Sequence, residues 1–463
     1  MGTTARTLLG RARTTAKTLT QHLFITMEFF GGNGLANHAA GGAYGFLLSA
    51  APMLMIVAFF IIRGFQAAPE TAAALLQAVP FMDATLDGDW PALEFIVDAP
   101  LGIPALISML SIFWAGRIFA VSVQRGLKVV FAGAKKRNPL GNNLVTLAIE
   151  GLVLAAMLAI ILGSRTALRF YGAAGIFQDA LPSRLIGALF GSQLFRLAAL
   201  GSILYLAYRL IPANPPRKIA ALWGSVFCVI VYGAAATALG VMLRQPRYNF
   251  LYGTLSDLII LLVSVYFFFL SFFLGAQFAA VANSFEALLF LRLRETRSGG
   301  KKGGAGKGDI GSRVLRGLFF FTEGKLEKYG RSYRAGDTLM SKGEASREIY
   351  FLLDGEVDVL LAAEAGGEER PAGTLKAGAF LGEMSYLLSE GRSATIRART
   401  DVSALALPPA LFDAILGQDN ALDRSIIENL TRRIKRGNEQ IAALSGAMAA
   451  AGAAAPAAAE ARA

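Results

Sequence analysis

The chain has 463 residues, of which 54% are hydrophobic and 17% are charged, with 45 Lys and Arg against 33 Asp and Glu. Soluble domains carry about 25% charged residues, so this composition excludes a disordered chain and argues against a wholly soluble protein. The single cysteine excludes a disulfide framework, and with only two histidines the chain also lacks the common zinc-binding patterns.

The N-terminal arm, residues 1–37, interleaves basic and apolar side chains. Arg6, Arg11, Arg13 and Lys17 alternate with leucines. This pattern is typical of an amphipathic helix that lies on a membrane surface, with a mitochondrial transit peptide as the alternative.

Six apolar stretches follow the arm. A hydrocarbon core about 30 Å thick is crossed by about 20 apolar helical residues. The stretches lie near 39–63, 101–123, 144–164, 185–211, 219–243 and 255–282. The sequence therefore predicts a membrane all-α bundle of six transmembrane helices within residues 38–290.

Basic residues are divided unevenly between the two sides of this bundle. The arm and the loops on its side hold about twice as many Lys and Arg as the opposite loops, and the long loop near 66–100 is acidic. This bias predicts a multi-pass protein with both termini in the cytosol. The net charge of +12 is then explained by the cytosolic loops, with nucleic-acid binding as the alternative.

Four ionisable residues lie within or near the apolar stretches. They are Arg117, Glu150, Arg196 and Asp257. A charge at membrane depth costs a few kcal/mol, so it usually faces a partner or a wet cavity. Glu150 is a suitable partner for Arg117 or Arg196. A polar path for an anionic substrate and a buried structural pair both remain open.

Residues 291–316 are rich in glycine and lysine and are predicted to form a flexible linker. Such a linker is a poor rigid lever. Coupling between the parts that it joins would require docking of the second part onto the cytosolic loops of the first.

Residues 317–442 show the pattern of short strands. Residues 347–361 contain two apolar runs around Asp354-Gly355, which is a strong hairpin signal. Further runs lie near 370–376, 394–400 and 402–407, followed by a short helical pattern at 411–416 and a longer one at 422–441. The alanine-rich residues 443–463 are predicted to be a frayed tail.

The most informative segment is 376–399, KAGAFLGEMSYLLSEGRSATIRAR. Gly382 and Glu383 open a predicted helical turn, which presents backbone N–H groups to an anion. The planar guanidinium of Arg392 suits a phosphate, and the Glu383 carboxylate can accept a hydrogen bond from a sugar hydroxyl. A ligand with both a phosphate and a ribose fits this combination.

This segment resembles the phosphate-binding cassette of the cyclic nucleotide-binding domain family. The cassette pattern G-x-F-G-E, a spacer and R-[ST]-A matches Gly378, Phe380, Gly382, Glu383, Arg392, Ser393 and Ala394. The resemblance implies a cytosolic α+β β-roll (jelly-roll) in which Arg392 pairs with the cyclic phosphate and Glu383 accepts the ribose hydroxyl. Gly382, Met384, Ser393 and Ala394 would complete the site, and the helix near 420–441 would cover the base.

The resemblance implies a cyclic nucleotide as regulatory ligand, with cAMP favoured and cGMP as the alternative. Many domains of this kind have lost their ligand and persist as interaction modules, which is a second alternative. Some relatives carry a helix-turn-helix behind the lid helix. Only the alanine-rich tail follows here, so we expect neither DNA nor RNA as a partner.

The membrane part also resembles a known family. Residues 38–53, HAAGGAYGFLLSAAPM, and residues 252–279 are similar to the first and last spans of YihY/BrkB family integral membrane proteins. Gln277 stands where that family usually has Glu. The family has been linked to envelope lipids and has also carried a ribonuclease label.

Together these patterns predict a cyclic-nucleotide-responsive protein of the bacterial inner membrane that transports a solute or handles envelope lipids. A cyclic-nucleotide-gated ion channel is the alternative, although the sequence contains no carbonyl-filter or voltage-sensor pattern. We expect no catalytic residues and no metal site. The expected partners are the lipid bilayer, the cyclic nucleotide and a second copy of the chain.

Overall fold

The computed structural model describes residues 2–59, 117–132 and 141–146 except 118 and 142, 193–243, 254–299, 325–361, 370–418 and Thr431. These residues form two compact units. One unit contains Leu19–Phe285, and the other contains Met1–Thr18 together with Glu286–Ala463. We describe each unit separately, as the helical unit and the β-roll unit.

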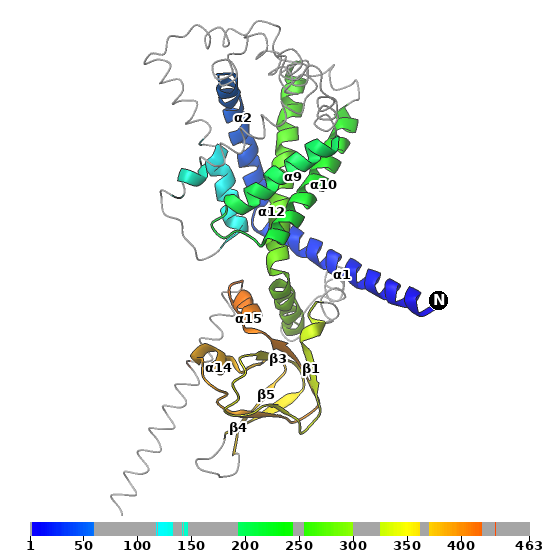
Figure 1. The fold of residues 1–463 in the computed structure, drawn as a ribbon, viewed down its shortest axis with the longest axis vertical. Coiled ribbons are helices and arrows are strands. Elements are labelled where there is room, and N and C mark those ends of the chain that lie inside the picture. The colour runs from blue at the N-terminus through cyan, green and yellow to red at the C-terminus, as the bar shows by residue number, and fades with distance from the viewer. Residues whose placement is uncertain are drawn as a thin grey trace, which may run out of the picture. The chain divides into compact units, whose positions relative to one another are not determined.

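The helical unit is built from long helices (Figure 1). They are α2 (Leu35–Phe59), α9 (Gln193–Leu210) and α10 (Lys218–Leu243), together with parts of α1 (Gly2–Gly32) and α12 (Thr254–Gly299). The unit contains α1 from Leu19 onward and α12 as far as Phe285. The predicted N-terminal arm is thus helical, and it ends where Gly34 takes a left-handed conformation with φ of +61°. A further helical segment covers residues 119–130.

Small residues let α10 and α12 approach closely. A Cβ atom at Gly275 would lie 2.6 Å from Cys228 Cβ and 2.8 Å from the Gly224 carbonyl oxygen. The buried Tyr208 of α9 donates a hydrogen bond of 2.7 Å to the carbonyl oxygen of Phe272. These contacts place three helices around one core, as expected where small residues replace bulky ones at helix interfaces.

Two helices are long and apolar enough to cross a bilayer among the residues that the structure describes. They are Lys218–Val241 and Ile259–Glu295, with Leu197–Leu210 as a shorter apolar helix. The last three predicted spans thus coincide with α9, α10 and α12, and the first coincides with α2. The predicted spans near 101–123 and 144–164 lie largely outside the described residues, so the number six stays a prediction.

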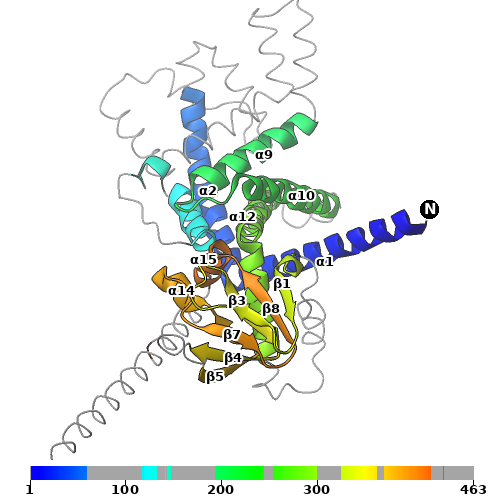
Figure 2. The same ribbon diagram turned by 60° about the horizontal axis from the view of Figure 1, so that its bottom comes forward.

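The β-roll unit contains two four-stranded antiparallel sheets, which Figure 2 shows facing each other. The first has the order β1 (Gly330–Tyr333), β8 (Val402–Leu407), β3 (Ile349–Asp354) and β6 (Phe380–Leu381). The second has the order β2 (Thr338–Met340), β7 (Thr395–Ala398), β4 (Glu356–Leu361) and β5 (Arg370–Lys376). Buried side chains from both sheets, including Leu352, Val357 and Leu381, form its core.

The predicted hairpin around Asp354-Gly355 is wrong in its pairing. Both strands exist as β3 and β4, but β3 pairs with β6 and β8 whereas β4 pairs with β5 and β7. Gly355 has φ of +89°, and a Cβ there would overlap the carbonyl oxygen of Asp401. The glycine therefore turns the chain from one sheet to the other, and each strand finds partners that are distant in sequence.

The start of the predicted linker is also corrected. Residues 291–299 belong to α12, which stays helical to Gly299 apart from a non-helical residue at Ser284. Leu293 in this stretch is only 1% exposed, so packing rather than glycine content determines its conformation. The remaining linker residues, 300–316, the long helical pattern at 422–441 and the tail at 443–463 lie outside the described residues, except for Thr431.

Candidate nucleotide-binding site

The cassette turn lies between β6 and the short helix α14 (Glu383–Leu388). Gly382 forms this turn with φ of +79°, a left-handed conformation that suits glycine. A Cβ at this position would also overlap the guanidinium of Arg392. Two features therefore require glycine at position 382, namely its left-handed backbone conformation and the Arg392 guanidinium that packs against it.

Arg392 is buried beneath this turn, with 3% of its surface exposed. Its Nη1 donates to the Ser385 hydroxyl at 2.9 Å and to the Gly382 carbonyl oxygen at 3.2 Å. Its Nη2 donates to the Glu348 carbonyl oxygen at 2.6 Å and to the Ser346 hydroxyl at 3.3 Å. All four acceptors are uncharged, and the buried Nε has no hydrogen-bond partner among the described residues.

The structure brings the other predicted site residues to the same end of the roll. Glu383 is the first residue of α14 and is 7% exposed. Glu383 is not among the acceptors that the structure gives for the Arg392 guanidinium in the described part of the chain. The alternative of a structural ion pair between Glu383 and Arg392 stays open. Met384 follows on α14 and is half-buried, whereas Ser393 and Ala394 precede β7.

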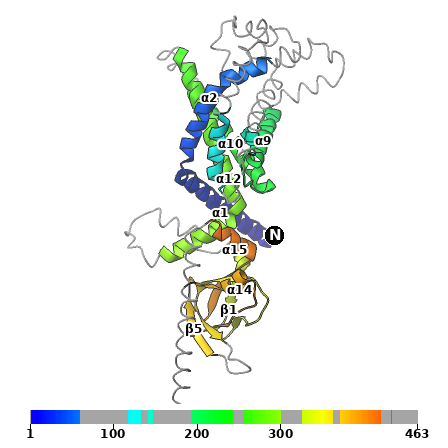
Figure 3. The ribbon, with the colours of Figure 1, turned by 90° about the vertical axis from the view of Figure 1, so that its left-hand side faces the viewer.

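The cassette helix contacts a second short helix, α15 (Pro409–Leu416), as Figure 3 shows. The Tyr386 ring packs edge-on against Phe412 with centroids 5.3 Å apart, and its hydroxyl donates to the Asp413 carboxylate. Burial and this hydrogen bond raise the pKa of Tyr386 to about 12. A ring contact and a hydrogen bond thus join α14 of the cassette to α15.

The distal segment of α12, residues 286–299, packs on the roll. Phe290 is fully buried, with its ring centroid 5.0 Å from that of Phe351 and 6.1 Å from that of Phe380. Arg297 Nη1 donates to the Leu353 carbonyl oxygen at 2.9 Å, and Glu286 accepts from Lys328 Nζ at 2.7 Å. The segment is thus fixed to the roll by aromatic, polar and ionic contacts.

The predicted polar residues of the membrane part are only partly placed. Arg117 donates to Asn143 Oδ1 at 3.1 Å. Arg196 and Asp257 lie in α9 and α12, but their side chains are outside the described residues, as is all of Glu150. The predicted pairing of Glu150 with Arg117 or Arg196 therefore stays a prediction.

Sequence reasoning missed the residues that hold Arg392 in place. Ser385 is 3% exposed and lies within the cassette segment. Its position between Glu383 and Arg392 in the motif was the signal in the sequence that could have identified it. Ser346 and the Glu348 carbonyl come from the loop before β3, and no local pattern links them to the cassette. In the described part of the chain, no group of His, Cys, Asp and Glu residues is arranged to hold a metal ion.

Two family models match the chain. The model described as Virulence factor BrkB matches residues 26–289, and the model described as Cyclic nucleotide-binding domain matches residues 330–419. The second match contains the cassette turn, Arg392 and α15. The first match contains α2, α9, α10 and the proximal part of α12.

The chain is also similar to individual proteins over one or the other of these parts. A UPF0761 membrane protein of Aromatoleum aromaticum is 29% identical over 264 residues, which is 57% of either chain. The cAMP-activated global transcriptional regulator of Pseudomonas aeruginosa is 25% identical over 119 residues, 25% of this chain and 55% of the relative. The solved catabolite activator protein of Thermus thermophilus is 28% identical, with a TM-score of 0.24, over 25% of this chain and 54% of that one. The chain spans about half the length of these relatives.

Proposed function

Because the chain belongs to the virulence factor BrkB family of membrane proteins, we propose that its membrane part is regulated by a cyclic nucleotide bound to the β-roll. The regulated activity in this proposal is transport of a solute or handling of envelope lipids. The protein is multi-pass in the bacterial inner membrane with both termini in the cytosol. It catalyses no reaction and binds no nucleic acid.

The environment of Arg392 carries the proposal. A buried charge is normally paired, because its desolvation costs several kcal/mol that neutral dipoles offset only in part. Here the guanidinium is buried and its hydrogen bonds go to uncharged acceptors, while its Nε has no acceptor among the described residues. An anionic phosphate entering beside the cassette turn would supply the missing charge and accept bonds from a planar fork.

The other cassette residues take the roles that the family resemblance implies. The Glu383 carboxylate accepts a hydrogen bond from the ribose hydroxyl. The backbone at Gly382, Met384, Ser393 and Ala394 lines the site of the phosphate. cAMP is favoured over cGMP, with support from the cAMP-activated regulator that matches this region.

The distal segment of α12 supplies the route for coupling. Gly382 lies two residues after Phe380, and the Phe380 ring is 6.1 Å from the ring of Phe290 in this distal segment. α12 is interrupted at Ser284, and the residues after this interruption pack on the β-roll, so one continuous chain segment joins the apolar helix to the domain with the nucleotide site. Nucleotide binding shifts the membrane part if the nucleotide has different affinities for two arrangements of this contact.

Calorimetric titration of the full chain in detergent with cAMP and cGMP tests the nucleotide site. We expect Arg392→Ala to lose binding and Arg334→Ala to retain it. Arg334 is a matched control because it is an exposed arginine of the same unit whose side chain has no partner in the described part of the chain. If the folded wild-type chain binds neither nucleotide, the β-roll is a ligand-free interaction module and the proposal is wrong.

A further inference from the structure

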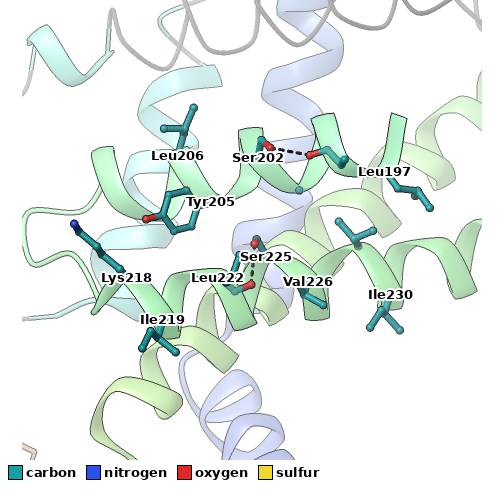
Figure 4. Close-up of a pocket in the computed structure, with 13 residues that line it drawn as sticks. Leu197, Ser202, Tyr205, Leu206, Lys218, Ile219, Leu222, Ser225, Val226 and Ile230 are labelled. Atoms are coloured by element: carbon teal, nitrogen blue, oxygen red, sulfur yellow. Dashed lines mark hydrogen bonds between the residues drawn. The ribbon is translucent and has the colours of Figure 1, made fainter. Parts of the chain in front are cut away.

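An open groove of about 800 Å³ lies between α9 and α10 (Figure 4). Its walls are mainly aliphatic and include Leu197 and Leu206 of α9 and Leu222, Val226 and Ile230 of α10. Several of these side chains are strongly exposed, with Leu222 at 53% and Ile230 at 63%. The groove therefore presents a continuous apolar surface outside the helix core.

The two serine hydroxyls that line the groove are directed to backbone carbonyl oxygens. Ser202 Oγ donates to the Ala198 carbonyl oxygen at 2.8 Å, and Ser225 Oγ donates to the Leu222 carbonyl oxygen at 2.9 Å. Figure 4 shows both bonds within their own helices. Because each of these serine hydroxyls donates a hydrogen bond to a carbonyl oxygen of its own helix, a bound molecule need not supply polar partners along the walls.

One end of the groove is cationic. Lys218 is exposed at the start of α10, and Figure 4 shows its ammonium group and the Tyr205 hydroxyl directed toward the same end. The neighbouring Arg217 is also exposed. Within the described residues, neither Lys218 nor Arg217 forms an ion pair, and no acidic side chain lines the groove.

The length of the groove matches one leaflet of a bilayer. From Lys218 to Ile230 the axis of α10 rises about 18 Å, at 1.5 Å per residue. Half of a hydrocarbon core about 30 Å thick is about 15 Å. A cation at the headgroup level and an apolar wall one leaflet long are complementary to a single amphiphile with an anionic head.

We propose that this groove binds one anionic phospholipid, with an acyl chain along α9 and α10 and the phosphate at Lys218 and Tyr205. The site lies in α10, one of the two described helices long and apolar enough to cross a bilayer, and it is lined by residues of the helical unit alone. The proposal goes beyond nucleotide regulation, because no residue of the cassette takes part in it.

Native mass spectrometry of the nucleotide-free full chain, released from detergent with phosphatidylglycerol or phosphatidylcholine of identical chains, tests this site. We expect the wild type to retain phosphatidylglycerol in preference. Lys218→Gln removes one cation near the surface and should weaken phosphatidylglycerol binding about fivefold. Lys128→Gln, at an exposed lysine of the same unit outside the groove, should have no effect.

A second pair of variants tests the groove itself. Val226 and Val241 are both exposed valines of α10, at 40% and 67%, but only Val226 lines the groove. Val226→Trp should obstruct the groove midway along α10 and strongly reduce retention of both lipids, whereas Val241→Trp should leave retention unchanged. Equal retention of the two lipids by the wild type, or wild-type retention by folded Val226→Trp, would overturn the proposal. Loss of a dimer in Val226→Trp with lipid retention intact would assign the groove to a second copy of the chain instead.

Discussion

Phe290 of α12 packs edge-on against Phe351 of β3, with the ring centroids 5.0 Å apart and the rings at 79°. The two residues belong to segments of opposite character. One lies on an apolar helix that is long enough to cross a bilayer, and the other lies on a strand of the β-roll. The contact holds the distal segment of α12, residues 286–299, against the domain that carries the nucleotide site.

Replacing Phe290 tests this contact. Phe290→Ala should weaken docking of the distal segment by about 3–5 kcal/mol, because a fully buried aromatic ring is lost. Amide hydrogen exchange in residues 286–299 should then accelerate by about two orders of magnitude or more. Phe267→Ala removes a ring that is 36% exposed on the same helix and should leave exchange in this segment unchanged. Unchanged exchange in Phe290→Ala would contradict the docking.

The cassette glycines should differ in their tolerance of alanine. Gly382→Ala combines a left-handed backbone with an overlap against the Arg392 guanidinium, so we expect nucleotide affinity to fall more than tenfold. Gly378 also has positive φ, at +94°, but a Cβ there meets nothing within 4 Å. Gly378→Ala should therefore cost only about 1–2 kcal/mol in stability and leave calorimetric affinity nearly intact. Similar affinities for the two variants would show that the Arg392 position is not critical.

The Tyr386 hydroxyl should couple the cassette to α15. Tyr386→Phe keeps the ring contact with Phe412 but removes the hydrogen bond to Asp413, which is worth about 1.5–3 kcal/mol for a charged acceptor. A double-mutant cycle with Asp413→Ala, which removes the acceptor, should give a coupling energy of about 1 kcal/mol or more when it is measured by urea unfolding. Additive effects of the two substitutions would mean that the bond contributes nothing in solution.

Close packing of α10 and α12 predicts a sharp difference between two glycines. Gly275→Ala places a Cβ within 2.8 Å of Cys228, Tyr208 and the Gly224 carbonyl, so it should destabilise the helical unit by about 1–3 kcal/mol. Gly240→Ala on α10 meets nothing within 4 Å and should be neutral or stabilising. Thermal unfolding in detergent distinguishes them, and equal midpoints would contradict the close approach.

Local patterns in the sequence predicted much of this architecture. The runs near 370–376, 394–400 and 402–407 coincide with β5, β7 and β8, and the helical turn at Gly382-Glu383 is α14. These elements have strong local signals, namely alternating apolar residues and turn-forming glycines. The position of Arg392 beside the cassette turn followed from the same motif.

Long-range contacts could not be predicted in this way. A turn signal at Asp354-Gly355 does not reveal that the flanking strands join different sheets, because pairing depends on distant strands. Phe290 packs against Phe351 and Phe380, which lie far along the chain. The glycines after residue 298 indicated a linker, so no local pattern in the sequence predicted this packing. Ser346 became part of the Arg392 environment only through the fold.

Hydrogen exchange of the full chain in lipid nanodiscs, with and without saturating cAMP, tests the central claim most directly. The account predicts that cAMP changes exchange in the distal segment of α12 and also in residues 193–285 of the helical unit. Arg392→Ala should abolish both changes at the same cAMP concentration, and Arg334→Ala should preserve them. If calorimetry shows that cAMP binds and exchange within residues 193–285 stays the same, the nucleotide does not regulate the membrane part.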